Sequence, residues 1–254
     1  MICSISDVHI KSPGDERSIL FEKFLDSTQV EESKYIFLLG DIFDLMVGCH
    51  DQYLNLYKSI FENLSQLALS GKKIYFLEGN HDFHLGELMS KFVLKYGLGS
   101  AFFHSEEALQ LTIRGRDVYL CHGDDIEIDN PKYKAYRTLI RSSQVQFLAN
   151  KIVPYHVVEL VGTVASSQSR KKNNMRYDLS DDKVISDIRE KFRMSAKIVK
   201  SMNPDVELLL SGHSHVIDHF EQEGFEYLNN GYFPKEKSFI YIDEAFNASF
   251  VKLD

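Results

Sequence analysis

The segment Ile2-Cys-Ser-Ile-Ser-Asp7-Val-His9 decides the fold, because a short apolar run in it ends in a carboxylate and an imidazole. The same arrangement, a strand-like run followed by a polar cluster, occurs at four later places. The later clusters are Gly40-Asp41-Ile42-Phe43-Asp44, Gly79-Asn80-His81-Asp82, Cys121-His122-Gly123-Asp124 and Gly212-His213-Ser214-His215. Since the carboxyl ends of parallel strands share one edge of an open α/β sheet, we expect the five clusters to lie close together.

Strand-like and helix-like stretches alternate along the first hundred residues. Predicted strands cover residues 2–6, 35–39 and 73–77, and predicted helices cover residues 16–27, 53–70 and 85–96. This alternation predicts βαβ units and a mostly parallel sheet. The runs 109–113 and 118–121 then flank Arg114-Gly115-Arg116, which is typical of a hairpin, so we expect the sheet to be mixed.

The strand-like pattern stops between residues 131 and 202. Segments 133–149, 153–165 and 181–202 have helical periodicity instead. Strand-like runs return at residues 206–210, 216–221, 225–228, 238–242 and 245–252. We therefore predict an α/β core made of residues 1–130 and 201–254, interrupted by a helical insertion at residues 131–200.

The charge of the chain is distributed unevenly. The net charge is −8, yet residues 131–200 contain 15 Lys and Arg against 6 Asp and Glu, which leaves the predicted core strongly acidic. An acidic core excludes a nucleic-acid binder that relies on attraction to phosphate. The basic insertion is either a solvated surface, the usual state of a charge run, or part of a binding site.

Cysteine use and hydropathy indicate the compartment. Cys3, Cys49 and Cys121 are widely spaced and form no C-x-x-C pair, which argues against a disulfide framework or a thiolate zinc site. The first residues lack a basic leader with an apolar run, and no stretch reaches the roughly 20 apolar residues of a spanning helix. We expect a cytoplasmic protein that is soluble or peripheral to a membrane.

The clusters are rich in carboxylate, amide and imidazole groups, which suit Mn²⁺, Fe²⁺, Co²⁺ or Zn²⁺. Seven such donors are too many for one tetrahedral zinc ion, and they suit two metal ions that share a bridging carboxylate. Two dications against two carboxylates would leave a net positive centre, so the expected guest is an anionic phosphate ester.

The order DxH, GDxxD, GNHD, HGD and GHSH resembles the calcineurin-like metallophosphoesterase superfamily over nearly the whole chain. The resemblance implies a four-layer αββα sandwich with mixed sheets and a helical cap. It also implies two divalent metal ions, for which we expect Mn²⁺, with Asp41 as the bridging ligand. The expected ligands are Asp7, His9, Asp41 and His215 for one ion and Asp41, Asn80, His122 and His213 for the other.

Other residues of the clusters receive supporting roles from the same resemblance. His81 is expected to face the leaving group or the phosphate as an acid or charge stabiliser. Asp44, Asp82 and Asp124 flank the expected ligands, and they are expected to fix the imidazole tautomers and the loop geometry without binding metal. Asn80, His81 and His213 are also expected to contact the substrate.

The insertion resembles that of UDP-2,3-diacylglucosamine hydrolases of lipid A biosynthesis, through Tyr133, Ser169, Asn173 and Arg176. The resemblance implies an acylated sugar-nucleotide substrate, cleaved at its pyrophosphate to UMP and 2,3-diacylglucosamine 1-phosphate. It also implies peripheral contact with lipid at the cytoplasmic face of the inner membrane. The neutral donors of Ser and Asn suit sugar and amide groups, and Arg suits a phosphate.

Two alternatives stay open at this point. One is another metallophosphoesterase, acting on a nucleotide or phosphodiester, and the other is a non-catalytic scaffold with the same fold. The chain departs from many hydrolases of this type by GNHD in place of GNRD and by Val216-Ile217 after GHSH. All seven expected ligands are nevertheless present, which favours an enzyme.

Overall fold

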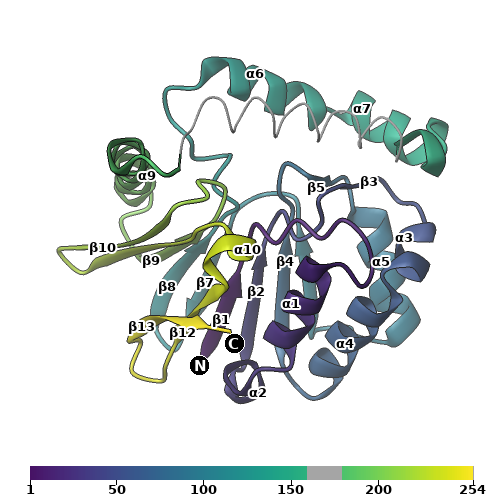
Figure 1. Ribbon diagram of the computed structural model, residues 1–254, viewed down its shortest axis with the longest axis horizontal. Helices are drawn as coiled ribbons and strands as arrows, with labels where there is room; N and C mark the ends of the chain where they lie inside the picture. Colours follow the sequence, from purple (N-terminus) through teal and green to yellow (C-terminus); the bar gives the residue numbers. More distant parts are fainter. Residues whose placement is uncertain (159–178, 254) are drawn as a thin grey trace.

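The computed structural model describes residues 1–158 and 179–253, and in it two β-sheets pack face to face between layers of helices (Figure 1). The first sheet has six strands in the order β13-β12-β1-β2-β4-β6. Its strands are β1 (Ile2–Ile5), β2 (Tyr35–Leu39), β4 (Lys73–Leu77), β6 (Phe102–Ser105), β12 (Ser238–Ile242) and β13 (Ala248–Lys252). β1, β2, β4 and β6 run parallel, whereas β12 pairs antiparallel with β1 and β13 pairs antiparallel with β12, which makes the sheet mixed.

The second sheet has five strands in the order β10-β11-β9-β8-β7. Its strands are β7 (Leu109–Ile113), β8 (Arg116–Leu120), β9 (Val206–Ser211), β10 (Ile217–Gln222) and β11 (Phe225–Asn230). The expected hairpin is present as the antiparallel pair β7 and β8. A third, two-stranded sheet joins β3 (Met46–Val47) to β5 (Asp82–Phe83), directly beside two of the polar clusters.

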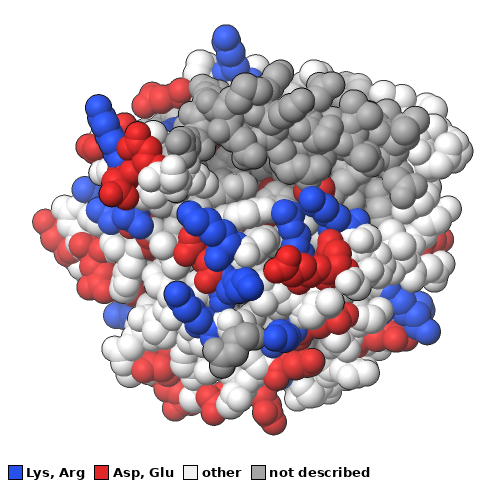
Figure 2. Space-filling model, viewed as in Figure 1, with Lys and Arg blue, Asp and Glu red and all other residues white. Residues whose placement is uncertain are grey.

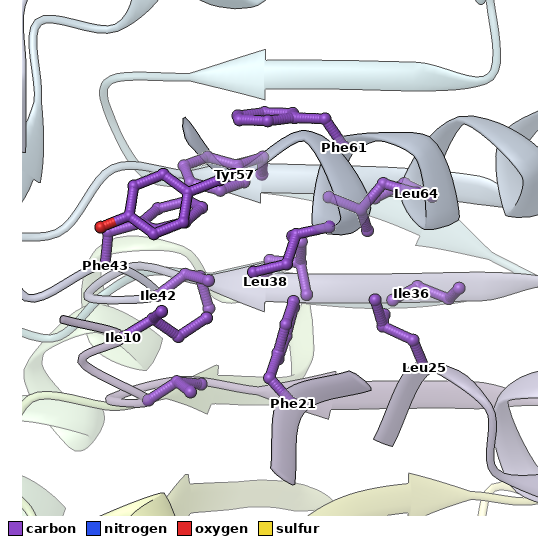
Figure 3. Close-up of a cluster of buried hydrophobic side chains, with 14 of the residues drawn as sticks. Ile10, Phe21, Leu25, Ile36, Leu38, Ile42, Phe43, Tyr57, Phe61 and Leu64 are labelled. Atoms are coloured by element: carbon purple, nitrogen blue, oxygen red, sulfur yellow. The ribbon is translucent and has the colours of Figure 1, made fainter. Parts of the chain in front are cut away.

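Helices cover the outer face of the first sheet. They are α1 (Glu16–Leu25), α2 (Thr28–Glu32), α3 (Gln52–Leu56), α4 (Lys58–Leu69) and α5 (Gly86–Tyr96). Side chains of α1, α4 and β2 interlock in this layer, as Figure 3 shows for Phe21, Leu38 and Leu64. The strand β2 is buried on both faces, because Ile36 and Leu38 point to these helices while its alternate residues point to the second sheet.

The space between the two sheets holds a second apolar cluster, to which Phe37 and Leu39 of β2 contribute together with Leu120 of β8 and Leu208 of β9. A third cluster lies on the outer face of the second sheet. There Phe192 of α9 (Asp182–Met202) packs against the sheet with its neighbours one turn away. The layers are therefore helix, sheet, sheet, helix, and the expected αββα sandwich is confirmed.

The helix α9 falls within the segment expected to be an insertion, yet it forms the outer layer on the second sheet. The described part of that segment also contains α6 (Pro131–Ile140), α7 (Ser143–Phe147), the π-helical turn η1 (Leu148–Ile152) and helical residues at 155–158. Figure 1 shows α6 and α7 running across the top of the molecule, over the carboxyl ends of the first sheet. A short helix, α10 (Phe233–Glu236), follows β11.

Several element boundaries differ from the sequence-based expectation. The helix expected at 133–149 is broken at Ser142, whose hydroxyl accepts the N–H of Val145 and starts a new helix. The helix expected at 53–70 is similarly divided at Tyr57. The strand β6 was not predicted, because it has only four residues and ends in His104 and Ser105, which are weak strand formers.

The surface charge is mixed on the face seen in Figure 2, where Lys and Arg side chains lie beside Asp and Glu. The acidic balance of the core sequence therefore does not give a uniformly acidic surface on this face. Within residues 1–158 and 179–253, no helix combines the length and the hydropathy needed to cross a bilayer.

Replacing Phe192 by Ala tests the place of α9 in the core. Phe192 is 5% exposed, and removing its ring should lower the free energy of unfolding by about 3–5 kcal/mol. The matched control is Met194→Ala on the same helix, because Met194 is 51% exposed and its loss should cost less than about 0.5 kcal/mol. Urea unfolding of both variants measures the difference, and equal stabilities would contradict the packing.

Candidate metal centre

His9 of the first expected ligand group and His122 of the second both approach the carboxylate of Asp41. The Nε2 atoms of His9 and His122 lie 3.7 and 3.6 Å from Asp41 Oδ2, and both imidazoles are buried. His215 Nε2 lies 3.3 Å from Asp7 Oδ1. Asp41 therefore lies between two groups of donors, the place that a bridging carboxylate requires.

A second group forms around the amide of Asn80. Its Oδ1 lies 3.1 Å from His122 Nε2 and 3.0 Å from His213 Nδ1. All seven residues expected as ligands are thus brought together from five loops, and they form two adjoining groups. Their role as ligands stays a prediction that the geometry allows.

Three groups of residues at this edge, which share members, could each hold a metal ion. Within each group, the ligand atoms all lie within 4.8 Å of one another. They are Asp7, His9 and His215; His9, Asp41 and His81; and Asp7, Asp41 and His122. The second set includes His81, which the sequence placed near the phosphate rather than among the ligands. His81 therefore lies close enough to the expected metal site to contact its guest.

The donors of His9 support metal occupancy. Both ring nitrogens are buried, and neither has a hydrogen-bond partner among the described residues. A buried polar atom without a partner is costly, and a divalent cation bound to an imidazole nitrogen removes that cost. The donor set, which is carboxylate, amide and imidazole, fits Mn²⁺ and similar ions.

The backbone at the expected ligands is strained. Asp7, His9, Asp41, His213 and His215 all have φ between 53° and 65°, in the left-handed region that side chains seldom adopt. Strain of this kind costs about 1–3 kcal/mol per residue and collects at functional sites, where surrounding structure enforces it. The strained turns direct these side chains back across the strand ends.

Glycines allow the loops to approach the expected ligands closely. A Cβ atom on Gly79 would overlap Oδ1 and the backbone N of Asp41. A Cβ atom on Gly212 would overlap the Asp7 carboxylate and the Ser6 hydroxyl. The glycines that begin GNHD and GHSH are therefore needed for the contact between loops.

Groups behind the imidazoles determine which nitrogen faces the centre. His122 Nδ1 donates to the carbonyl of Leu39 at 2.8 Å, so its other ring nitrogen, Nε2, faces Asp41 and Asn80. His213 Nε2 lies 3.5 Å from Glu127 Oε2, which leaves its Nδ1 toward Asn80. Sequence reasoning missed Glu127, because a single Glu in the loop after HGD has no spacing that marks it.

His81 is oriented in the same way. Its Nδ1 donates to the carbonyl of Asp44 at 2.9 Å, and its backbone N–H donates to Asp41 Oδ1 at 2.8 Å. A carbonyl only accepts, so Nδ1 carries the proton and Nε2 is the atom left for a substrate. The geometry suits the expected role of acid or charge stabiliser.

Asp44, Asp82 and Asp124, the carboxylates expected to support the metal ligands without binding metal themselves, have different partners. Asp82 accepts four backbone N–H groups, while Asp44 Oδ1 lies 3.8 Å from His9 Nδ1. Asp124 Oδ2 accepts from the hydroxyl of Tyr133 and from Nε of Arg137, at 3.2 and 2.9 Å. Asp82 and Asp124 therefore hydrogen-bond to neighbouring segments of the site, and their expected supporting role stays a prediction.

The buried carboxylates and imidazoles of the centre shift one another's pKa values. Burial alone would lower the pKa of His122, but the charges of Asp41, Asp7 and Asp124 outweigh it and raise the pKa to about 9. Burial raises the pKa of Asp7, yet the facing imidazole of His215 and the other histidines hold it well below its usual range. The carboxylates that stabilise the cationic form of His122 are also groups that can stabilise a bound cation.

Of the residues expected to bind substrate from the insertion, the structure describes Tyr133. Its ring lies 5.6 Å from that of His213, and its hydroxyl is engaged with Asp124. Burial, with the nearby Asp124 charge next, raises the pKa of Tyr133 far above its usual value, so the hydroxyl keeps its proton. Ser169, Asn173 and Arg176 lie outside the described residues.

Comparisons with known proteins show which sequences and structures this chain resembles. The sequence model of calcineurin-like phosphoesterases matches residues 2–217. A UDP-2,3-diacylglucosamine hydrolase of Haemophilus influenzae (strain PittGG) is 26% identical over 249 residues, covering 98% of this chain and 97% of the relative. One from Neisseria meningitidis serogroup A is 26% identical over 250 residues with the same coverage. A solved archaeal phosphodiesterase has a TM-score of 0.49 at 11% identity and covers 99% of both chains.

Replacing Gly79 by Ala tests the close approach of the loops. The new Cβ should displace Asp41, lower the free energy of unfolding by about 1–3 kcal/mol and weaken Mn²⁺ binding. Gly86→Ala is the control, because its Cβ would meet only the end of the Glu106 side chain and one atom of His104. Isothermal titration with Mn²⁺ gives both affinities, and unchanged binding in Gly79→Ala would show that the loops do not need this contact.

Proposed function

Because the chain belongs to the calcineurin-like phosphoesterase family and is a hydrolase of that family, we propose that it cleaves the pyrophosphate of UDP-2,3-diacylglucosamine. The products are UMP and 2,3-diacylglucosamine 1-phosphate. The observation that carries the proposal is that relatives named for this hydrolase align with about 98% of the chain, well beyond the metal-site loops. The match includes the insertion, which in this proposal selects the substrate.

Two divalent metal ions, Mn²⁺ in this proposal, serve the reaction. Asp7, His9, Asp41 and His215 would hold one ion, and Asp41, Asn80, His122 and His213 would hold the other. When bound, such ions polarise phosphoryl oxygens and lower the pKa of water to near neutrality. The buried nitrogens of His9 and the strained turns support this assignment.

The chain's own residues orient the reaction. Hydrolysis adds the oxygen of water to one phosphorus and breaks its bond to the bridging oxygen of the pyrophosphate. His81, whose Nδ1 proton is held by the Asp44 carbonyl, presents Nε2 and, as an imidazolium, donates a proton to that departing oxygen. Leu39 and Glu127 hold His122 and His213 so that their opposite nitrogens face the centre.

The insertion supplies the lipid-binding part of the proposal. The helices α6 and α7 and the turn η1 carry five large exposed apolar side chains: Tyr136, Leu139, Phe147, Leu148 and Ile152. An acyl chain would cover such a surface. Tyr133, Ser169, Asn173 and Arg176 are proposed to contact the sugar nucleotide.

The proposed substrate carries two acyl chains and lies in a membrane. The excess of Lys and Arg in residues 131–200 would draw the enzyme to anionic lipid, on the cytoplasmic face of the inner membrane. The association is therefore peripheral in this proposal.

Replacing Asp41 by Ala tests the bridging role. We expect the variant to bind fewer than two Mn²⁺ ions and to lose activity by roughly 10²- to 10³-fold, as expected when a main electrostatic stabiliser is removed. Asp205→Ala is the control, because Asp205 is an exposed carboxylate outside the site. Metal analysis and single-turnover hydrolysis are the measurements. Two ions with near wild-type turnover in Asp41→Ala would contradict the role.

Varying the acyl chains tests the substrate. If the chains are buried, removing about four methylenes in total should lower kcat/KM on the order of 10²-fold, at about 0.8 kcal/mol per methylene. Hydrolysis of diacylated, shortened and deacylated substrates in detergent micelles gives the ratio. Parity between the diacylated and deacylated substrates would instead indicate an enzyme for soluble nucleotides.

A further inference from the structure

The helix α6 turns one side toward the core. Tyr133, Arg137 and Arg141, the residue that ends the helix, are spaced four apart, so they lie on the same side. These three are partly buried, whereas Lys132 and Lys134 are exposed. Polar groups on this side therefore contact the core, although the helix has no fully buried residue.

Arg141 donates hydrogen bonds to the loop that follows β4. Its Nη2 donates to the carbonyl of Gly79 at 2.9 Å, and its Nη1 donates to Glu78 Oε2 at 3.2 Å and to the carbonyl of Glu106 at 2.7 Å. The Arg141 side chain is only 9% exposed. A guanidinium satisfies these three acceptors at once because its donors form a rigid planar fork.

Glu78 is the buried partner that makes this contact costly to lose. Its side chain is fully buried and also accepts from the backbone N–H groups of His84 and Leu85 and lies 3.1 Å from His104 Nε2. A buried carboxylate that loses its cation leaves an uncompensated charge. The segment from Glu78 to Leu85, which carries Asn80 and His81, is therefore organised around one carboxylate and one arginine.

The other end of α6 contacts a different loop of the site. Tyr133 and Arg137 both donate to Asp124, two residues after His122. The helix thus joins the loop of Asn80 to the loop of His122, whose side chains lie 3.1 Å apart. A rigid element across both loops fixes the distance between these two donors.

We propose that Arg141 is a positioning residue for the metal group formed by Asn80, His122 and His213. By holding the Gly79 carbonyl, it sets the orientation of the peptide that precedes Asn80 and so directs the Asn80 amide. The inference rests on the proposed function, since it takes Asn80 as a metal ligand. It gives the insertion a second task, which is to complete the metal site in addition to selecting substrate.

The test compares Mn²⁺ binding in Arg141→Ala, Arg141→Lys and the wild-type chain. We expect wild type to bind two ions, and both variants to bind one ion normally and the other about 10–100-fold more weakly, as for other residues that orient metal ligands. Lys134→Met on the same helix is the matched control, because Lys134 is exposed, and it should bind both ions as wild type does.

Guanidinium rescue distinguishes positioning from a general loss of structure. Millimolar guanidinium should restore the weakened site in Arg141→Ala, and equal sodium chloride should not, because only guanidinium reproduces the fork. If Arg141→Ala fails to fold, Arg141→Lys decides, since it keeps the charge and loses the fork. Wild-type affinity at both sites in Arg141→Lys, or in a folded Arg141→Ala, would overturn the inference while leaving the proposed function intact. Fewer than two ions in wild type would instead overturn the proposed function, and this inference with it.

Discussion

One buried carboxylate ties the site together. Asp82 accepts the N–H groups of Gly79, Asp41, Ile42 and Phe43 at 2.7 to 3.2 Å, and so joins the loop after β4 to the loop after β2. The placement of Asp41 between two donor groups depends on this junction. Burial, together with the charge of Asp41, raises the pKa of Asp82 to about 8. A cation beside Asp41 would offset that charge and favour the ionised, loop-holding form.

The two sheets supply the rigidity that the strained loops require. Five expected ligands have left-handed backbone conformations, and these persist only where the surrounding structure determines them. The strands just before them are buried on both faces, as β2 is through Leu38 on one side and Leu39 on the other. Apolar packing in three clusters therefore stabilises the strand ends, where the loops carry charged side chains and left-handed backbone conformations.

The helices of segment 131–202 pack against two different parts of the core, the outer face of the second sheet and the loops at the strand ends. The helix α9 completes the sandwich through Phe192, and its Lys191 pairs with Glu127, the carboxylate that faces His213. The helix α6 lies over the strand ends and is joined to the loops by arginines rather than by apolar packing. Polar anchoring leaves the apolar side chains of α6, such as Leu139, available to a ligand.

The sequence by itself determined the alternation of strands and helices, the mixed sheets and the five clusters, because strand and turn signals are local and the shared strand edge follows from topology. It also identified the seven donors that the structure brings together, although their roles as ligands stay predictions. The break at Ser142 is a local cap to Val145 that the helical periodicity did not reveal. Only the tertiary structure decided the strand β6, the position of Glu127 beside His213 and the pairing of Glu78 with Arg141. Each of these three depends on a contact between residues far apart in the chain, and no local pattern encodes which distant group a buried charge will meet.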